Sequence, residues 1–271
     1  MTRLRHTVRQ QIEEVSDLKT IRYAAACVQG NARRNNEDNL FCDGFYLPEN
    51  NSGMEEIRTG QLTGSRSMVA VFDGMGGEAA GETAAYLAAR TLSEENSKAN
   101  TFSGRLALRL NSTGAAAGLC RSMNDAVCRY ASTNRIRSMG STVAGLLISG
   151  KQITGFNLGD SRIYHMSDDG FQQISQDHNE RSVIRRKTPL TQFLGIPESE
   201  MHIEPHYNAR PLHANERYLL CTDGVTDVLE DSEIQEFLCN TSSPADTIRA
   251  MLDKISACGY VDNTTLILLE T

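Results

Sequence analysis

The stretch Met68–Leu87, MVAVFDGMGGEAAGETAAYL, joins an apolar run, a glycine-rich break and an alanine-rich segment. The apolar run Met68–Phe72 predicts a buried strand, and the residues from about Glu78 predict a helix. Asp73 lies at the junction, where burying a carboxylate is costly unless it is paired or binds a cation. Asp73 and the Gly74 carbonyl oxygen are therefore candidate metal ligands. An ordinary strand-to-helix turn, in which Asp is common, is the equally favoured alternative on this stretch alone.

The composition of the chain excludes several classes of protein. Of its 271 residues 39% are hydrophobic and 23% charged, and the net charge of −7 argues against nucleic acid as a partner. Seven scattered cysteines without a CxxC pair indicate reduced thiols rather than disulfides or a zinc site. No apolar run approaches the roughly 20 residues of a membrane span, and the basic N-terminus lacks the apolar core of a secretory signal. We therefore expect a cytoplasmic protein with no membrane partner.

The order of strand and helix patterns predicts an α+β fold, in which antiparallel sheets are covered by helices. The pattern favours one domain over residues 21–271, preceded by an N-terminal extension at 1–20 that is a short helix or a frayed segment. Residues 48–66 are rich in turn formers and predict a loop. The predicted strands are 21–28, 39–47, 68–72, 141–149, 152–158, 161–167, 170–174, 202–209, 216–221 and 263–269, with 141–174 as an antiparallel meander. The predicted helices are 78–92, 105–131, 231–238 and 244–258.

Further acidic residues lie next to predicted strands, as Asp73 does. Asp223 follows an apolar strand in LLCTDGV, Asp262 precedes the last strand, and Asp160 occupies a tight turn between two strands. The pair Glu37-Asp38 precedes the second strand. Several strands that each deliver a carboxylate predict a shared cation site, although for Asp160 a turn is a sufficient explanation. Oxygen ligands without histidine or thiolate favour Mg²⁺ or Mn²⁺ over zinc.

Seven motifs occur in order over residues 22–270: RRNNED, FDGMGG, GST, GDSR, DH, CTDG and DNTT. Together they resemble the type 2C metal-dependent Ser/Thr protein phosphatases (the PPM family), in particular the bacterial single-domain members. The resemblance implies an α-β-β-α four-layer sandwich of two antiparallel sheets flanked by helices. It also implies hydrolysis of phosphoserine and phosphothreonine by a water that bridges two Mn²⁺ or Mg²⁺ ions. The partners it implies are phosphorylated proteins, the targets of a Ser/Thr kinase, and we expect a monomer.

The resemblance also assigns metal ligands to residues of this chain. Asp73 is expected to bridge both ions, and Asp223 and Asp262 to complete the first site. Glu37 and the Gly74 carbonyl are expected to serve the second site.

Three further residues receive a role through the resemblance. Asp38 is expected in the outer shell or bound through water, and Asp160 at an additional, weaker metal position. Arg33 matches the arginine that receives the substrate phosphate, which its bidentate guanidinium suits. A plain surface arginine beside Arg34 is the alternative for Arg33. Turnover is expected to depend on Arg33, Asp73 and Asp223.

The sequence departs from the family pattern at two places. Eukaryotic relatives have a histidine where this chain has Met75, so the acid that protonates the leaving group is unassigned. His178 is a candidate proton donor, with a structural hydrogen-bonding role as the favoured alternative. The segment between His178 and Gly195 is shorter than the flap of many bacterial relatives. It is basic, and Arg185 and Arg186 are predicted to bind substrate, with a solvated loop as the alternative.

Two other functions compete with the phosphatase. A pseudophosphatase, or phosphoprotein-binding regulator, binds phosphoproteins without turnover, but such proteins usually lose metal carboxylates and this chain retains them. A hydrolase of a small phosphorylated metabolite is compatible with the sequence. Turnover of phosphopeptides compared with metabolite phosphates distinguishes the two enzymes.

Overall fold

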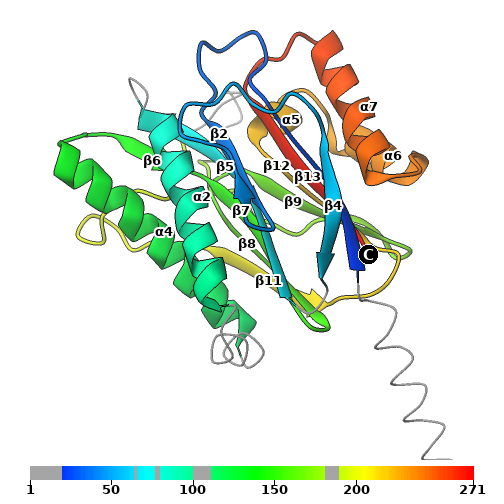
Figure 1. The fold of residues 1–271 in the computed structure, drawn as a ribbon, viewed down its shortest axis with the longest axis horizontal. Helices are drawn as coiled ribbons and strands as arrows, with labels where there is room; N and C mark the ends of the chain where they lie inside the picture. The colour runs from blue at the N-terminus through cyan, green and yellow to red at the C-terminus, as the bar shows by residue number, and fades with distance from the viewer. Residues whose placement is uncertain (1–19, 64–65, 77–79, 100–110, 181–188) are drawn as a thin grey trace, which may run out of the picture.

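The computed structural model describes residues 20–63, 66–76, 80–99, 111–180 and 189–271. Two antiparallel sheets pack face to face, and a pair of helices covers the outer face of each (Figure 1). This four-layer α-β-β-α sandwich confirms the predicted fold class. The predicted division into an extension and a catalytic domain stays a prediction, because residues 1–19 lie outside the described residues.

The first sheet has six strands in the order β10-β9-β12-β13-β1-β4. Their bounds are β1 Thr20–Val28, β4 Arg58–Thr63, β9 Arg162–Ser167, β10 Gly170–Gln173, β12 Arg217–Cys221 and β13 Thr264–Glu270. The second sheet runs β11-β8-β7-β5-β2-β3, and β6 pairs with the end of β5. Its strands are β2 Asp38–Cys42, β3 Phe45–Tyr46, β5 Arg66–Gly76, β6 Met139–Ser141, β7 Val143–Ser149, β8 Gln152–Leu158 and β11 His206–Pro211.

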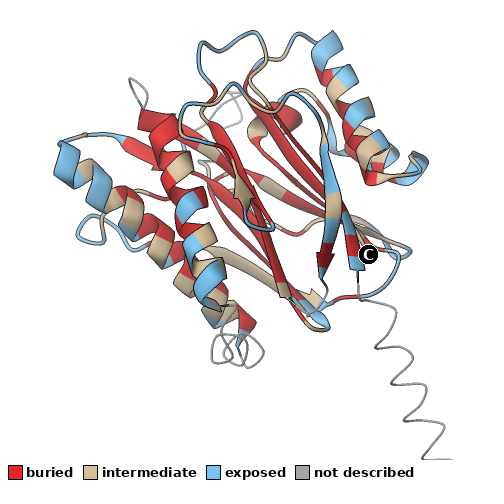
Figure 2. Cartoon of the chain, viewed as in Figure 1, coloured by how far each residue is buried: buried red, intermediate tan, exposed pale blue. Residues whose placement is uncertain are grey.

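The central strands are buried on both faces, which explains why they are apolar without alternation (Figure 2). In β1, Tyr23 and Ala25 face the core between the sheets, while Ala24 and Ala26 face the helices of the first sheet. These helices are α6, Asp231–Asn240, and α7, Pro244–Ala257; the one-turn helix α5, Asp223–Thr226, follows β12. Side chains from two layers thus cover each central strand completely.

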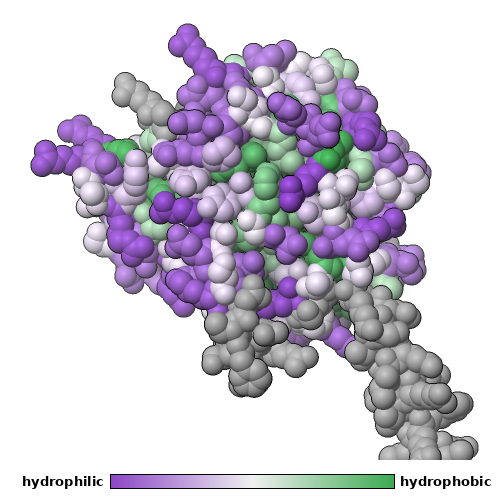
Figure 3. Space-filling model, viewed as in Figure 1, coloured by the Kyte–Doolittle hydropathy of each residue, from purple (hydrophilic) through white to green (hydrophobic). Residues whose placement is uncertain are grey.

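The second sheet is covered by α2, Ala80–Ala99, and α4, Ser112–Asn134. Small side chains let α2 approach the sheet and α4 closely, and Ala84, Ala85, Ala88 and Ala89 are fully buried. The helix α4 starts where the Asn111 side chain accepts a hydrogen bond from the Gly114 N–H, at 2.8 Å. In one view the outer surface is mainly hydrophilic, with hydrophobic side chains scattered between polar ones (Figure 3). Among the described residues, no helix is long and apolar enough to cross a membrane.

Several predicted boundaries are wrong. The predicted strand 39–47 is the hairpin β2–β3, because Asp43 and Gly44 adopt positive φ angles of 52° and 84°. The predicted loop 48–66 contains β4, whose polar residues pair with β1 at the sheet edge. The strand predicted at 202–209 begins four residues later, at His206. The helix α2 continues beyond residue 92, and α4 begins at Ser112, with 105–110 outside the described residues.

The predicted meander over 141–174 is also wrong, since its strands belong to different sheets. The strands β7 and β8 pair in the second sheet, whereas β9 and β10 pair in the first. The chain crosses between the sheets at Gly159-Asp160, where Gly159 has a φ of 99°. Asp160 therefore lies in a turn between layers rather than within a hairpin.

The strand that decides the fold is longer than predicted. β5 does not end at Phe72 but continues to Gly76, with Gly74 opposite Ser141 and Met75 opposite Gly140 on β6. Only glycine fits at Gly74, because a Cβ there would come within 2.1 Å of the Gly81 carbonyl oxygen. Asp73 is thus held inside a paired strand, which positions it more rigidly than a turn would.

Candidate metal centre

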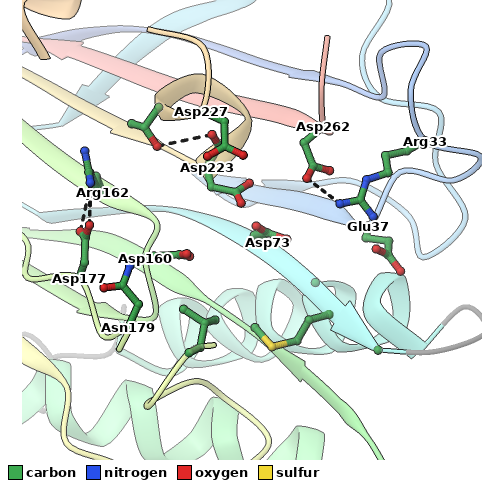
Figure 4. Close-up of a pocket in the computed structure, with 15 residues that line it drawn as sticks. Arg33, Glu37, Asp73, Asp160, Arg162, Asp177, Asn179, Asp223, Asp227 and Asp262 are labelled. Carbon is green, nitrogen blue, oxygen red and sulfur yellow. Dashed lines mark hydrogen bonds and ion pairs between the residues drawn. The ribbon is translucent and has the colours of Figure 1, made fainter. Parts of the chain in front are cut away.

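A cavity of about 520 Å³ opens where the ends of the two sheets meet. In Figure 4 acidic side chains converge on it, with Arg33 at one end and Arg162 at the other. Its charged and polar lining residues are Arg33, Glu37, Asp73, Asp160, Arg162, Asp177, Asn179, Asp223, Thr226, Asp227 and Asp262. The structure therefore brings Arg33 and all the predicted metal ligands except Asp38 to one cavity.

Asp73 lies in the middle of this set and is fixed through its backbone. Its N–H donates to the Thr142 hydroxyl at 3.0 Å, and the Thr142 N–H donates to its carbonyl oxygen at 2.8 Å. The Thr142 hydroxyl is also 2.6 Å from the hydroxyl of Ser161, the residue after Asp160. Buried hydroxyls thus link Asp73 on β5 to the turn that carries Asp160. Desolvation, followed by the charges of Asp223 and other nearby carboxylates, raises the pKa of Asp73 well above its usual value.

Asp223, Asp227 and Asp262 form one side of the cavity. Each offers a carboxylate oxygen, and these oxygens lie within 4.8 Å of one another. Asp223 opens α5, and the Asp227 N–H donates to its carbonyl oxygen at 2.7 Å, so one helical turn brings the two together. Asp227 was not among the ligands predicted from the sequence, although it follows Asp223 by four residues in TDGVTD, a spacing that brings two side chains together once a helix forms.

Glu37 and Gly74 are joined directly, since the Gly74 N–H donates to the Glu37 carbonyl oxygen at 3.0 Å. The Glu37 N–H donates in turn to the Asn263 side chain at 2.9 Å. The Asn263 amide then binds the carbonyl oxygens of Gln29 and Asn35, which fixes the loop that carries Arg33. Burial raises the pKa of Glu37, and the charge of Arg33 opposes that shift.

Asp38 is buried behind the cavity wall and does not line the cavity. The hydroxyl of Thr222, the residue before Asp223, donates a hydrogen bond to the Asp38 carboxylate at 2.8 Å. Burial, together with the charges of Asp223 and Asp262, raises the pKa of Asp38 to about 8, although the hydrogen bond from Thr222 opposes the shift. Its position agrees with an outer-shell role, which stays a prediction.

Arg33 reaches the acidic set from the loop after β1. Its Nη2 donates to Asp262 at 2.6 Å, and its side chain remains 46% exposed, so it faces both the carboxylates and the cavity opening. The bond to Asp262 is the main cause that raises the pKa of Arg33. The neighbouring Arg34 is exposed and does not line the cavity.

The opposite wall is held by Arg162 and Asp177. Arg162 makes a bidentate contact to the Asp177 carboxylate, with its Nη2 at 2.7 Å from Oδ2 and its Nε at 3.1 Å from Oδ1. The next residue, His178, does not line the cavity, and its ring Nδ1 lies 3.2 Å from the Gly159 N–H. This geometry supports the structural alternative for His178 over proton donation. Arg185 and Arg186 lie outside the described residues.

The donor set fits hard divalent cations. Its side-chain donors are carboxylate oxygens that raise one another's pKa, and no histidine or thiolate lines the cavity among the described residues. Oxygen ligands of this kind suit Mg²⁺ and Mn²⁺.

A model of the Protein phosphatase 2C family matches residues 56–257. The serine/threonine phosphatase Stp of Listeria innocua is 27% identical over 239 residues, which cover 82% of this chain and 89% of that protein. The serine/threonine protein phosphatase PstP of Mycobacterium tuberculosis is 27% identical over 92% of this chain and 45% of its own length.

Solved structures agree with these matches. The catalytic domain of PstP in complex with two manganese ions is 26% identical and superposes with a TM-score of 0.70. The match covers 93% of this chain and 98% of that structure. A second PstP structure, from Mycobacterium tuberculosis, is 24% identical with a TM-score of 0.72 and shows the same fold.

Proposed function

Because the chain belongs to the protein phosphatase 2C family, we propose that it is a metal-dependent phosphatase of phosphoserine and phosphothreonine residues in proteins. The observation that carries the proposal is the convergence of Asp73, Asp160, Asp223, Asp262 and Glu37 on one cavity that also holds Arg33. Carboxylates packed this closely repel one another, and divalent cations remove that repulsion.

Two Mn²⁺ or Mg²⁺ ions are the cofactors. Asp73 is central in the acidic set and is proposed to bridge both ions. Asp223 and Asp262 are proposed to hold the first ion, and Glu37 with the Gly74 carbonyl oxygen the second. A third, weaker position is proposed at Asp160. The closeness of Asp227 to Asp223 and Asp262 makes Asp227 a further ligand candidate beside these two residues.

When bound, the ions neutralise phosphate charge and lower the pKa of the attacking water. The protein supplies position: the β5–β6 pairing and Thr142 hold Asp73, and Asn263 holds the loop of Arg33. Arg33 is proposed to bind two phosphate oxygens with its guanidinium while Asp262 orients it. The acidic cavity holds no cysteine among its described lining residues, in keeping with attack by water rather than by a side chain.

The test is turnover of p-nitrophenyl phosphate and of a phosphothreonine peptide with Mn²⁺, and with chelator. We expect activity only with Mn²⁺ or Mg²⁺, and loss of turnover in Asp223→Asn with metal present. Activity that persists in chelator would contradict the proposal.

Two alternatives are settled by the same assays. A pseudophosphatase binds phosphoproteins without turnover, whereas this chain keeps its full set of carboxylates. A metabolite phosphatase would hydrolyse small phosphate esters with a kcat/KM above that for phosphopeptides. We expect the reverse order.

The physiological partners are phosphorylated proteins, and we propose that these are targets of a Ser/Thr kinase, with the enzyme acting as a cytoplasmic monomer. Sedimentation of the purified chain tests the monomer.

Arg185 and Arg186 are proposed to draw in phosphoproteins. Their double alanine variant is expected to slow phosphoprotein turnover more than that of p-nitrophenyl phosphate, with a deficit that shrinks as salt screens the charges. Equal effects on both substrates would show that Arg185 and Arg186 have no role in binding phosphoproteins.

A further inference from the structure

Two lining residues of the metal cavity stand apart from the rest. Among the described residues that line it, Met75 and Leu190 alone have wholly apolar long side chains, whereas most of the others are charged or polar. Both are only partly buried, so neither is part of a closed hydrophobic core. An apolar side chain at the edge of a charged cavity can bury its remaining exposed surface by covering carbon atoms of a ligand.

Both residues are held on firm backbone. Met75 lies within β5 opposite Gly140, and a Cβ at Gly140 would come within 2.6 Å of the Phe193 ring. Phe193 therefore packs over the strand pair that carries Met75.

The short segment that carries Leu190 is fixed by backbone pairing at both ends. Leu190 forms a β-bridge with Asn179, and the next N–H, of Thr191, donates to the His178 carbonyl oxygen at 2.9 Å. Further on, Leu194 and Ser141 exchange two backbone hydrogen bonds, of 2.8 and 3.0 Å. The two apolar side chains thus line the cavity from fixed positions, as a binding subsite requires.

The spacing indicates which part of a substrate they would meet. Met75 is two residues beyond Asp73 on the same face of β5, a separation of about 7 Å at 3.3–3.4 Å per strand residue. A separation of about 7 Å spans two residues of an extended peptide, at about 3.5 Å per residue. A phosphate held at Asp73 and Arg33 therefore leaves room over Met75 for a peptide side chain up to two residues from the phosphorylated one.

We infer that Met75 and Leu190 form an apolar subsite that selects phosphoproteins with an apolar side chain within two residues of the phosphorylated residue. This inference rests on the proposed phosphatase function and names a substrate preference of the same cavity. Partial burial of a leucine side chain there favours turnover by about 5- to 10-fold over a serine at the same place.

The experiment compares phosphothreonine peptides that differ at a single position, which holds either leucine or serine. That position lies one or two residues before or after the phosphothreonine. The readout is the leucine-to-serine ratio of kcat/KM with Mn²⁺ for each enzyme variant. Because both peptides meet the same enzyme, changes in metal or phosphate affinity cancel in the ratio. We expect a ratio of about 5 to 10 on at least one side for the wild type, falling to about 1 to 2 in Met75→Ala and Leu190→Ala.

Two further variants separate a specific subsite from a general loss of packing. Met75→Leu keeps an apolar side chain and should keep the ratio, and Met201→Ala removes an exposed methionine outside the cavity and should leave it unchanged. A wild-type ratio near 1, or an unchanged ratio in both cavity variants, overturns the inference alone. Failure of the wild type to hydrolyse any of the peptides with Mn²⁺ overturns the proposed function instead.

Discussion

The two ends of β12 carry acidic residues in opposite ways. At the strand's start, buried Glu216 accepts hydrogen bonds from the Tyr218 hydroxyl at 2.7 Å and the His213 N–H at 3.1 Å, and its other oxygen lies 3.2 Å from His165 Nε2. Just beyond its end, Asp223 faces other carboxylates, and together they raise the pKa of Asp73. At the start of β12 the charge of Glu216 is compensated by hydrogen-bond donors of the protein, whereas beyond its end several negative charges lie close together.

The difference shows which buried charges are structural. Glu216 accepts hydrogen bonds from two residues, and its neighbour His165 also contacts the guanidinium of Arg210, so this end joins the two sheets by paired groups. The acids around Asp73 repel one another, an arrangement that costs stability unless a ligand offsets it. We therefore assign stability to the Glu216 end and chemistry to the Asp73 end.

The largest effect is expected at the chemical end. Asp73→Asn should reduce turnover of p-nitrophenyl phosphate by about 10³-fold or more, because metal-ion charge stabilisation is worth several kcal/mol. The fold should persist in chelator, since the change removes a repelling carboxylate. Turnover and thermal unfolding of the same sample measure both. Near-normal turnover in Asp73→Asn would remove the distinction between the two ends.

The next effect concerns the cation on the rim of the acidic end. Arg33→Ala should weaken phosphopeptide binding by about 10- to 150-fold, because a charge-assisted hydrogen bond is worth roughly 1.5–3 kcal/mol. Steady-state KM and Mn²⁺ affinity are measured in parallel. The exposed neighbour offers a matched control, and Arg34→Ala should leave both unchanged. A loss confined to Mn²⁺ affinity would contradict a role of Arg33 in binding phosphate.

The sequence predicted the chemical end better than the structural end. Asp73, Asp223 and Asp262 were predicted to lie together because a carboxylate beside an apolar strand is unusual in local sequence and the motifs occur in order, and the structure places all three in one cavity. The cluster around Glu216 was missed, because Arg210, His165 and Tyr218 come from strands whose pairing no local pattern reveals. Asp227 was missed for a smaller reason, since the one-turn helix α5 is too short for a periodic signal.

The four layers were predicted correctly, whereas the details that depend on tertiary pairing were not. The extension of β5 to Gly76 follows from its pairing with β6. From the local sequence alone, the glycines there predict the end of the strand. The crossing between sheets at Asp160 has the same local sequence as a hairpin turn. Strand membership of a particular sheet is set by long-range contacts that propensity and spacing do not contain.

A moderate effect on stability is expected at the structural end. Glu216→Gln should lower the free energy of unfolding by about 1–3 kcal/mol, because it weakens charge-assisted bonds and leaves a donor among buried donors. Urea unfolding measures the change, and Glu198→Gln, on an exposed loop, serves as the control. The kcat/KM of the folded variant should stay close to wild type. A large loss of kcat/KM without loss of stability would show that the two ends are coupled.

The smallest effect is a pH dependence at the same end. Burial and the charge of Arg210 lower the pKa of His165, while Glu216 and Asp169 oppose the shift, and Tyr218 packs against the ring. In the unfolded chain His165 therefore binds a proton near pH 6.5, whereas in the folded chain it binds one only at a lower pH. Stability is present above pH 6.5 and is lost as the pH falls toward the lowered pKa, by at most about 1.4 kcal/mol per pH unit.

The variant His165→Gln removes this proton and should flatten that part of the profile. Urea unfolding at pH 7.5, 6.5 and 5.5 with saturating Mn²⁺ compares the slopes of wild type and variant. Equal slopes would show that the pKa of His165 does not differ between the folded and the unfolded chain.

We propose that the acids within β5 and beyond the end of β12 hold the catalytic ions, whereas the acid at the other end of β12 does not. Calorimetric titration of Mn²⁺ into wild type, Asp73→Asn and Glu216→Gln tests it most directly. We predict two tightly bound ions in the wild type and in Glu216→Gln, and loss of that tight binding in Asp73→Asn. Unchanged Mn²⁺ stoichiometry and affinity in Asp73→Asn would contradict the account.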